Sequence, residues 1–338
     1  MARAPKIIDV ARLAGVSTAT VSRALNNPES VSPETRGAVL RSANEVDYRI
    51  NHAARSLRLQ KTGAVAVLIP NVGNPFFSNI LAGIESVMTK SSINVLVLDT
   101  HGHTSQSSLA DYLNSQRADG IICLDGQLAF DTVSNESFMH DLPVVYACEW
   151  PIKGVCNSVR SDNAKGAQLA VEHLVSLGHK HIGHLAGPTG NVLTSKRKRA
   201  TVDALHNCGL KVETSWFYNG DFGLASGTAA AKQWLTHKKR PTALFCSSDL
   251  MAIGVMAELM RCGVSVPGEL SLIGFDDIDI ARYYTPALTT IRQPTRELGS
   301  TAAKVLLDRL HGHNATDEKL LDIELIVRAS TATPSANG

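Results

Sequence analysis

Hydrophobic and polar residues alternate along this chain in two ways, and the change comes near Gly63. Before Gly63 the apolar positions recur at helical spacing, whereas after it continuous apolar runs alternate with amphipathic stretches. Runs of this kind are typical of strands that are buried on both faces. They are AVAVLIP (64–70), INVLVLD (93–99), GIICLD (120–125), PVVYACE (143–149), HIGHLAGP (181–188), TALFCSSD (242–249) and LSLIGFDD (270–277).

The stretches between these runs have the spacing of amphipathic helices. We expect helices near 77–90, 105–117, 163–177, 196–208, 224–237 and 249–262. Alternation of strands and helices predicts an α/β fold with parallel sheets covered by helices, and about 260 residues of it suffice for two sheets. Ligands of open sheets bind beyond the carboxyl ends of the strands, so the residues that follow each run are candidates for a site.

The first 50 residues predict three short helices. The tripeptide SPE (32–34) combines an N-cap residue, a proline at the first helical position and an acid in the first turn, so a helix should span about 33–46. A helix over 9–14 ends at Gly15, and Ser17 can cap the next helix.

The helix expected over 18–25 has two faces of different character. A step of 100° per residue puts apolar side chains on one face, which can pack on the preceding helix at Val10, Leu13 and Ala14. This apolar face consists of Val21, Ala24 and Leu25, and the free face of Ala19, Ser22 and Arg23. Two short helices joined by a turn that contains glycine form a helix-turn-helix.

The free face has side chains that suit a DNA major groove. Arg23 can make a bidentate pair with guanine, and the small Thr18 and Ala19 allow contact with the methyl group of thymine. Hydroxyl groups around them can hold phosphates, which positions the helix without reading bases, at Ser17, Thr20 and Ser22. The alternative is a three-helix packing element with a solvated arginine.

Charge favours the DNA interpretation. Residues 1–61 hold ten Lys or Arg against five Asp or Glu, whereas the other residues hold 23 against 26. A basic segment followed by a slightly acidic body predicts an anionic partner for the first segment alone.

The segment NHAARSLRLQKTG (51–63) predicts a second DNA contact. Asn51 can cap a helix over 52–59 that is too short to be stable alone, so it needs a partner or DNA to fold on. Leu57 lies between Arg55 and Arg58, which suits a side chain wedged into a minor groove while the arginines meet phosphates. Alternatively, Leu57 covers the body as part of a plain linker.

Composition excludes several other classes of protein. No stretch approaches the ~20 apolar residues of a membrane span, and the first residues lack the pattern of a signal peptide, so we expect a cytoplasmic protein. The six cysteines are scattered without ligand spacing, which predicts reduced thiols and no metal site. The nearest approach to metal spacing is the group His179, His181 and His184, which we interpret as structural because the last two lie on opposite faces of a strand.

At this point the chain resembles a known family. IDVARLAGVSTATVSRALN, the VSPETR helix start and the N-x-x-ARSL segment are similar to the DNA-binding head of the LacI/GalR family of bacterial transcription regulators. NPFF (74–77), HIGHLAGP, SSDLMAIG (247–254), IGFDDID (273–279) and YTPALTTIRQP (284–294) resemble its effector-binding body. The resemblance covers nearly the whole chain.

The resemblance implies a DNA-binding repressor that acts as a homodimer or tetramer on a pseudo-palindromic operator and needs no cofactor. It implies a head over 1–50, a hinge helix and linker over 51–62, a body over 63–330 and a flexible tail over 331–338. The body should resemble periplasmic sugar-binding proteins, with an N-subdomain of about 63–161 and 294–321 and a C-subdomain of about 162–293 and 322–330. The chain then crosses between the subdomains near 162, 293 and 322.

Functional residues of the family carry over to matching positions. The expected DNA-binding residues are Ser17, Thr18, Ala19, Thr20, Ser22, Arg23, Asn26, Ala54, Leu57 and Arg58. The expected effector-binding residues are Phe76, Phe77, Asp162, Arg197, Phe245 and Asp276. Alternatively, Phe76 and Phe245 are core residues and Asp276 caps a helix. Arg199 competes with Arg197, because Ala200 and Thr201 stand where the family has glycine and an aromatic residue.

The sequence indicates the chemical class of the effector and not its identity. Segments such as ACEW (147–150) and GDF (220–222) resemble nucleoside- and ribose-responsive members of the family, which favours a nucleoside or pentose over other sugars. Whether the effector weakens or strengthens DNA binding stays open. The rival function is a solute-binding protein without a regulatory role; an enzyme is not expected, because GxSxG, P-loop and GxGxxG motifs are absent.

Overall fold

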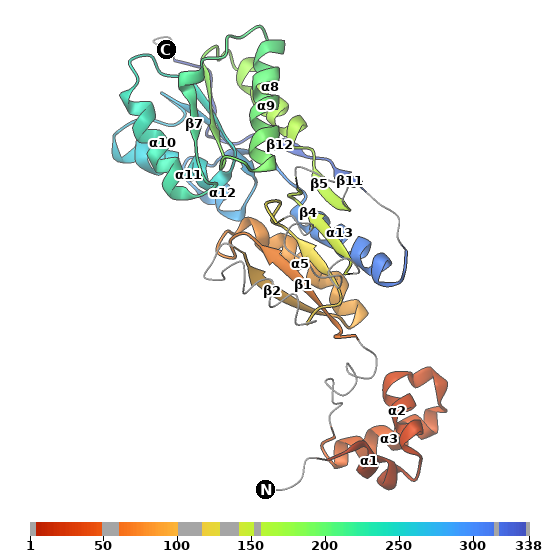
Figure 1. The fold of residues 1–338 in the computed structure, drawn as a ribbon. Coiled ribbons are helices and arrows are strands. Elements are labelled where there is room, and N and C mark those ends of the chain that lie inside the picture. Colours follow the sequence, from red (N-terminus) through yellow and green to blue (C-terminus); the bar gives the residue numbers. More distant parts are fainter. Residues whose placement is uncertain are drawn as a thin grey trace. The chain divides into compact units, whose positions relative to one another are not determined.

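The computed structural model describes residues 5–48, 61–100, 117–128, 142–151, 157–313 and 318–335. The chain forms two compact units, Met1–Lys61 and Thr62–Gly338, which we call the head and the body (Figure 1). In the described ranges no helix is long and apolar enough to cross a membrane.

The head contains the three expected helices, α1 (Ile7–Ala14), α2 (Thr18–Asn26) and α3 (Pro33–Glu45), with a 3-10 turn η1 (Pro28–Ser30) before the third. Gly15 ends α1 with a φ of 66°, a left-handed conformation that glycine adopts without steric cost. The hydroxyl of Ser17 accepts a hydrogen bond from the backbone N–H of Thr20, and that of Ser32 from Thr35, so both predicted N-caps are confirmed.

The head core differs from the expectation at one position. Val21 and Ala24 of α2 are buried as predicted, but Leu13 of α1 is 48% exposed. Buried residues of α1 recur at helical spacing on the side of Val10 and Ala11, whereas Leu13 is rotated away from that side. The buried core is Val10, Ala11, Val21, Ala24, Val39 and Ala43.

The body contains two six-stranded sheets, which confirms the predicted α/β class. Their orders are β11-β5-β4-β3-β1-β2 and β12-β10-β9-β8-β6-β7, and within these sheets only the β10–β12 pairing is antiparallel. The first sheet is built from β1 (Ala64–Ile69), β2 (Asn94–Asp99), β3 (Ile121–Cys123), β4 (Val144–Ala147), β5 (Ser158–Ser161) and β11 (Glu318–Leu321). The second is built from β6 (Ile182–Ala186), β7 (Phe217–Asn219), β8 (Ala243–Cys246), β9 (Ser271–Asp276), β10 (Thr289–Arg292) and β12 (Glu324–Ile326).

The chain passes between the two sheets three times, after β5, after β10 and after β11. The first sheet packs against α5 (Phe76–Met88) and α13 (Thr295–Leu310), and we call this layer the N-subdomain. The C-subdomain joins the second sheet to α8 (Asn163–Ser176), α9 (Val192–Asn207), α10 (Leu224–Thr236), α11 (Asp249–Arg261) and α12 (Asp279–Tyr283) (Figure 1). Short 3-10 turns are η2 (Thr89–Ser91) and η4 (Thr214–Trp216).

Two glycines let α5 and α13 approach closely. A Cβ atom on Gly83 would lie 2.2 Å from the carbonyl oxygen of Arg296, and one on Gly299 would lie 2.0 Å from that of Ile80. Both positions therefore exclude a side chain, because backbone atoms occupy the space.

Two segments differ from the sequence-based expectation. Helix α9 begins at Val192 and not near 196, because the side chain of Asn191 accepts hydrogen bonds from the N–H groups of Leu193 and Thr194 and caps the helix. The segment after Ser330 is docked as far as Ala332, whose backbone exchanges hydrogen bonds with Ser271, and not free from Thr331. The helix expected over 105–117 lies almost wholly outside the described residues.

Candidate functional site

The exposed face of α2 carries the side chains expected to read DNA. Thr18, Ala19 and Arg23 are exposed, whereas Thr20 and Ser22 are half-buried. The hydroxyl of Thr20 lies 2.9 Å from that of Ser17, so these two groups form a small polar cluster at the start of α2. Asn26 ends the helix. The expected hinge contacts Ala54, Leu57 and Arg58 lie outside the described residues.

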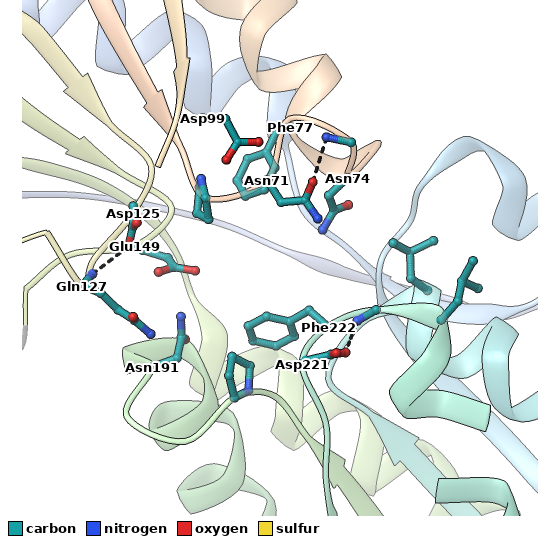
Figure 2. A pocket seen from close by; sticks show the side chains of 16 residues that line it. Asn71, Asn74, Phe77, Asp99, Asp125, Gln127, Glu149, Asn191, Asp221 and Phe222 are labelled. Carbon is teal, nitrogen blue, oxygen red and sulfur yellow. Dashed lines mark hydrogen bonds between the residues drawn. The ribbon is translucent and has the colours of Figure 1, made fainter. Parts of the chain in front are cut away.

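The body holds a cavity of about 550 Å³ between its two subdomains (Figure 2). Its walls come from the last residue of β2 and from segments that follow β1, β3 and β4 on one side and β6, β7 and β8 on the other, as ligand sites of open parallel sheets do. The lining residues are Pro70, Asn71, Gly73, Asn74, Phe77, Asp99, Asp125, Gln127, Glu149, Pro188, Asn191, Asp221, Phe222, Gly223, Leu224 and Leu250.

Acidic side chains of the N-subdomain line one wall of this cavity. Asp99 accepts a hydrogen bond from the backbone N–H of Val72 at 3.0 Å. Asp125 accepts hydrogen bonds from the hydroxyl of Thr100 at 2.6 Å and from the N–H of Gln127 at 2.9 Å. These bonds hold the carboxylates in place, and carboxylate oxygens are acceptors for hydroxyl groups of a ligand.

Glu149 and Asn191 line the cavity from different subdomains. The carboxylate of Glu149 accepts a hydrogen bond from the backbone N–H of Gly126 at 3.1 Å. Burial raises the pKa of Glu149, and the nearby Asp125 raises it further, although the Asn191 side chain and the Gly126 bond oppose the shift. A carboxyl group of the N-subdomain thus lies near the residue that caps α9 in the C-subdomain.

Two aromatic side chains lie on opposite walls of the cavity (Figure 2). Phe77 belongs to the first turn of α5, and Phe222 lies in the loop between β7 and α10. Phe222 has a φ of 67°, which is rare for a residue other than glycine. Its ring lies so close to Gly187 that a Cβ atom there would be 2.2 Å from the ring, so Gly187 leaves the space that Phe222 occupies.

Arg197 is buried in the body, whereas Arg199 is exposed. The Arg197 guanidinium donates to the side-chain oxygen of Asn163 at 2.8 Å and to the carbonyl oxygen of Ser247 at 2.5 Å, and it lies 3.6 Å from the centroid of the Phe275 ring. Arg199 points away and lies 3.8 Å from Asp203 on the same helix. The arginine that belongs to the interior is therefore Arg197.

Asp276 lies at the end of β9 in a strained conformation with a φ of 124°. Its carboxylate accepts a hydrogen bond from the side chain of Gln293 at 2.8 Å. Burial raises its pKa to about 7, although the nearby Arg197 and the Gln293 bond lower it. Asp276 lines a second crevice of about 340 Å³, together with Phe76, and not the larger cavity.

Three of the expected effector residues, Arg197, Phe245 and Asp162, line neither cavity. The ring of Phe245 is fully buried in the core of the C-subdomain against His184 and Phe275, because β8 is covered on both faces. Asp162 accepts a hydrogen bond from the N–H of Lys165 and caps α8, and it lines neither of the two cavities described above. Arg197 and Asp162 thus differ from the sequence-based expectation, and Phe245 takes the alternative role of a core residue.

Several cavity residues were missed by residue-level reasoning. Asp125 and Glu149 end two of the apolar runs, so the rule that ligands bind beyond strand ends pointed to them. Asn191 and Phe222 lie in loops, and only the GDF (220–222) segment gave a signal, through the family resemblance.

The histidine-rich strand has a structural role. His184 is fully buried, its Nδ1 atom lies 3.1 Å from the carbonyl oxygen of Phe245, and burial lowers its pKa to about 3. His179 bonds to Thr242 and to the carbonyl oxygen of Ala332. In the part of the chain that the structure describes, no three His, Cys, Asp or Glu side chains are placed to hold a metal ion.

Comparison with known proteins identifies both units. Residues 6–51 match the family described as bacterial regulatory proteins, lacI family, and residues 171–331 match a periplasmic binding protein-like domain. The chain is 39% identical over 325 residues to the HTH-type transcriptional repressor CytR of Escherichia coli strain K12, covering 96% of this chain and 95% of that protein.

Solved structures give the same result. The lac repressor dimer bound to operator and the anti-inducer ONPF is similar with a TM-score of 0.85 and 30% identity over 98% of this chain and all of that one. A LacI family transcriptional regulator from Enterococcus faecium with bound ribose is similar with a TM-score of 0.73 and 30% identity, over 80% of this chain and all of that one.

Proposed function

This chain belongs to the LacI family of bacterial regulatory proteins, and on that premise we propose that it represses transcription by binding a pseudo-palindromic operator as a dimer. The observation that carries the proposal is the pairing of two features in one chain: Arg23 stands exposed on the second helix of a helix-turn-helix, and a ligand-sized cavity separates two subdomains. Thr18 and Ala19 flank Arg23 on that exposed surface and permit close approach to base edges.

We infer that the effector is a small molecule with a ribose ring, a nucleoside or a pentose. Phe77 and Phe222 face each other across the cavity and can stack on a planar base. Asp99, Asp125 and Glu149 supply acceptors for sugar hydroxyls. One similar solved structure, the regulator from Enterococcus faecium, has bound ribose, which agrees with this class.

We propose that the effector controls DNA binding by closing the cavity. An effector that contacts both walls changes how the N- and C-subdomains meet, which changes the arrangement of the N-subdomains across the dimer. That arrangement decides whether the two segments over 52–59 can pair on DNA, with Leu57 as the minor-groove contact and Ala54 and Arg58 beside it. Coupling of this kind is reciprocal, so operator DNA changes effector affinity by the same factor.

A solute-binding protein without a regulatory role is the weaker alternative. That function does not account for a basic head with an exposed Arg23. An enzyme is weaker still, because the Ser247–His184 pair, 3.4 Å apart and the serine–histidine hydrogen bond found among the described residues of the body, is fully buried in the core.

A single experiment tests both halves of the proposal. The full-length protein is titrated with operator fragments selected from random sequence, with and without a panel of nucleosides and pentoses, and its melting temperature is recorded with each compound. We expect sequence-specific binding as a dimer and one compound class that changes both operator affinity and melting temperature. Specific DNA binding that no compound alters would contradict the effector proposal, and binding that ignores sequence would contradict the repressor.

A further inference from the structure

Two of the three crossing segments reach the C-subdomain at neighbouring positions. The second crossing, 293–294, leaves β10 directly after Arg292, and the third, 322–323, enters β12 at Glu324. Arg292 and Glu324 are paired directly opposite each other in the antiparallel β10–β12 ladder. The C-subdomain ends of these two crossing segments are therefore held side by side.

The side chain of Arg292 bonds the ends of three strands together. Its Nε atom donates to the carboxylate of Asp277, the residue after β9, at 2.7 Å, and its Nη1 atom donates to that of Glu324 at 2.6 Å. The side chain of Asp277 is 5% exposed, whereas that of Arg292 is 46% exposed. A carboxylate withdrawn from water depends on its cationic partners far more than a surface carboxylate does. The bond between Arg292 and Asp277 thus has a structural weight that a surface ion pair lacks.

Further bonds attach the same place to the rest of the second sheet. Arg328, which follows β12, donates to the carboxylate of Asp277 and to the carbonyl oxygen of Leu288. Gln293, in the second crossing, donates from its side chain to Asp276 at the end of β9. We call the four charged residues of this place the ionic network: Glu324, Arg292, Asp277 and Arg328.

The first crossing is joined to the third by the backbone. The N–H group of Asp162 donates to the carbonyl oxygen of Leu321 at 3.1 Å, at the point where β11 ends. A rotation of one subdomain against the other must be absorbed by backbone dihedral changes in a few residues of the crossing segments. Because Arg292 fixes the C-subdomain ends of two segments, that change is confined to the short stretches 293–294 and 322–323.

We propose that Arg292 is a positioning residue of the allosteric control, which makes the second and third crossing segments turn together when the cavity closes. This inference rests on the proposed control of operator binding by an effector. With the two ends bonded to each other and to β9, closure moves α13 and the N-subdomain as one piece. Without these bonds each crossing segment bends separately, so closure is absorbed in the crossings and the effector no longer changes operator affinity.

Hydrogen–deuterium exchange of the full-length protein tests the local part of the proposal without any ligand. In Arg292→Gln, peptides that span the second and third crossings should both exchange at least about threefold faster than in the unchanged protein. Arg292→Lys keeps the charge and should restore slow exchange in part. Arg199→Gln, which removes an exposed ion pair within α9, is the control and should leave both peptides unchanged. Unchanged exchange in Arg292→Gln overturns the proposal.

A second measurement separates a positioning role from a merely structural one. Operator affinity is measured with and without saturating cytidine or ribose, and the affinity for each compound is measured by calorimetry. Arg292→Gln should bind the operator alone and the free compound within about twofold of the unchanged protein, while the factor by which the compound alters operator affinity falls at least about fivefold. Glu324→Gln, which releases the third crossing alone, should lower that factor as well, and Arg292→Lys should partly restore it.

The outcomes that contradict the proposal are distinct from those that contradict the proposed function. An unchanged factor in Arg292→Gln overturns the positioning role, and so does a variant that loses operator or compound binding itself. If neither cytidine nor ribose alters operator binding by the unchanged protein, the proposed effector class is wrong, and the exchange experiment decides by itself whether Arg292 holds the crossings together.

Discussion

The guanidinium of Arg197 lies 3.6 Å from the centroid of the Phe275 ring, and its bonds to Asn163 and Ser247 tie three segments of the C-subdomain together. Asn163 begins α8 immediately after the first crossing from the N-subdomain, and Ser247 follows β8. A single cation thus connects the start of α8 to the segment that follows β8. Buried cations of this kind are costly to disturb, because their partners are left without a bond.

Arg197→Ala should lower the free energy of unfolding by about 3 kcal/mol. It leaves the oxygen atoms of Asn163 and Ser247 without a hydrogen bond, and it removes the positive charge that stabilises the ionised Asp276. Denaturant unfolding of the body measures this loss. Arg199→Ala removes the same side chain two residues along the same helix, where it is exposed, and should change stability by less than about 0.5 kcal/mol. Equal losses for the two variants would contradict the structural role of Arg197.

Arg23→Ala should weaken binding to the specific operator by about 1–3 kcal/mol and leave dimerisation unchanged, because the side chain is exposed and makes no contribution to the head core. Arg23→Lys is the matched variant: it keeps the charge and loses the bidentate geometry, so it should lose specificity and retain binding to random DNA. Titrations with operator and random fragments separate these effects. If Arg23→Ala weakens both DNAs equally, Arg23 contacts phosphate and does not read a base.

Asp276 should make the body less stable as pH rises. Folding raises its pKa from the usual 3.8 to about 7, so the folded chain holds this proton more tightly than the unfolded chain does. The contribution is fully present below about pH 4 and is lost as pH rises through about 7. Asp276→Asn stays neutral and can still accept from Gln293, so its melting temperature should fall less than that of the unchanged protein between about pH 5 and about pH 8. Parallel pH curves for the two proteins would contradict the raised pKa.

Gly83→Ala should destabilise the body by about 1–3 kcal/mol, because the added methyl group meets the carbonyl oxygen of Arg296 and forces α5 away from α13. Gly37→Ala makes the same change within α3 of the head, where the nearest atom is the end of the Arg41 side chain at 3.4 Å, and should stabilise that helix by about 0.5–1 kcal/mol. Thermal unfolding monitored for head and body separately gives both values. A neutral Gly83→Ala would show that the two helices can separate without loss.

The elements of the fold follow from local patterns in the sequence. The apolar runs became strands, although β2 at the edge of its sheet is not buried on both faces. The caps at Ser17 and Ser32 lie where side-chain chemistry places them, because each depends on neighbours within a few residues. The alternation of strands and helices similarly predicts parallel sheets and a site at their carboxyl ends. Helical spacing also predicts the buried face of α2, whereas the expectation that Leu13 of α1 packs against that face is wrong.

Only the tertiary structure decided which side chains meet. Phe245 and Phe222 are both aromatic residues near strand ends. Phe245 is fully buried in the core, whereas Phe222 has a left-handed backbone conformation and lines the cavity. Arg197 and Arg199 lie on the same helix. Only the packing of that helix decides that the Arg197 side chain is buried against Phe275 and that the Arg199 side chain is exposed to solvent. The sequence determines the elements because they depend on local chemistry. The site depends on side chains such as Glu149 and Asn191, which line one cavity only because two subdomains come together.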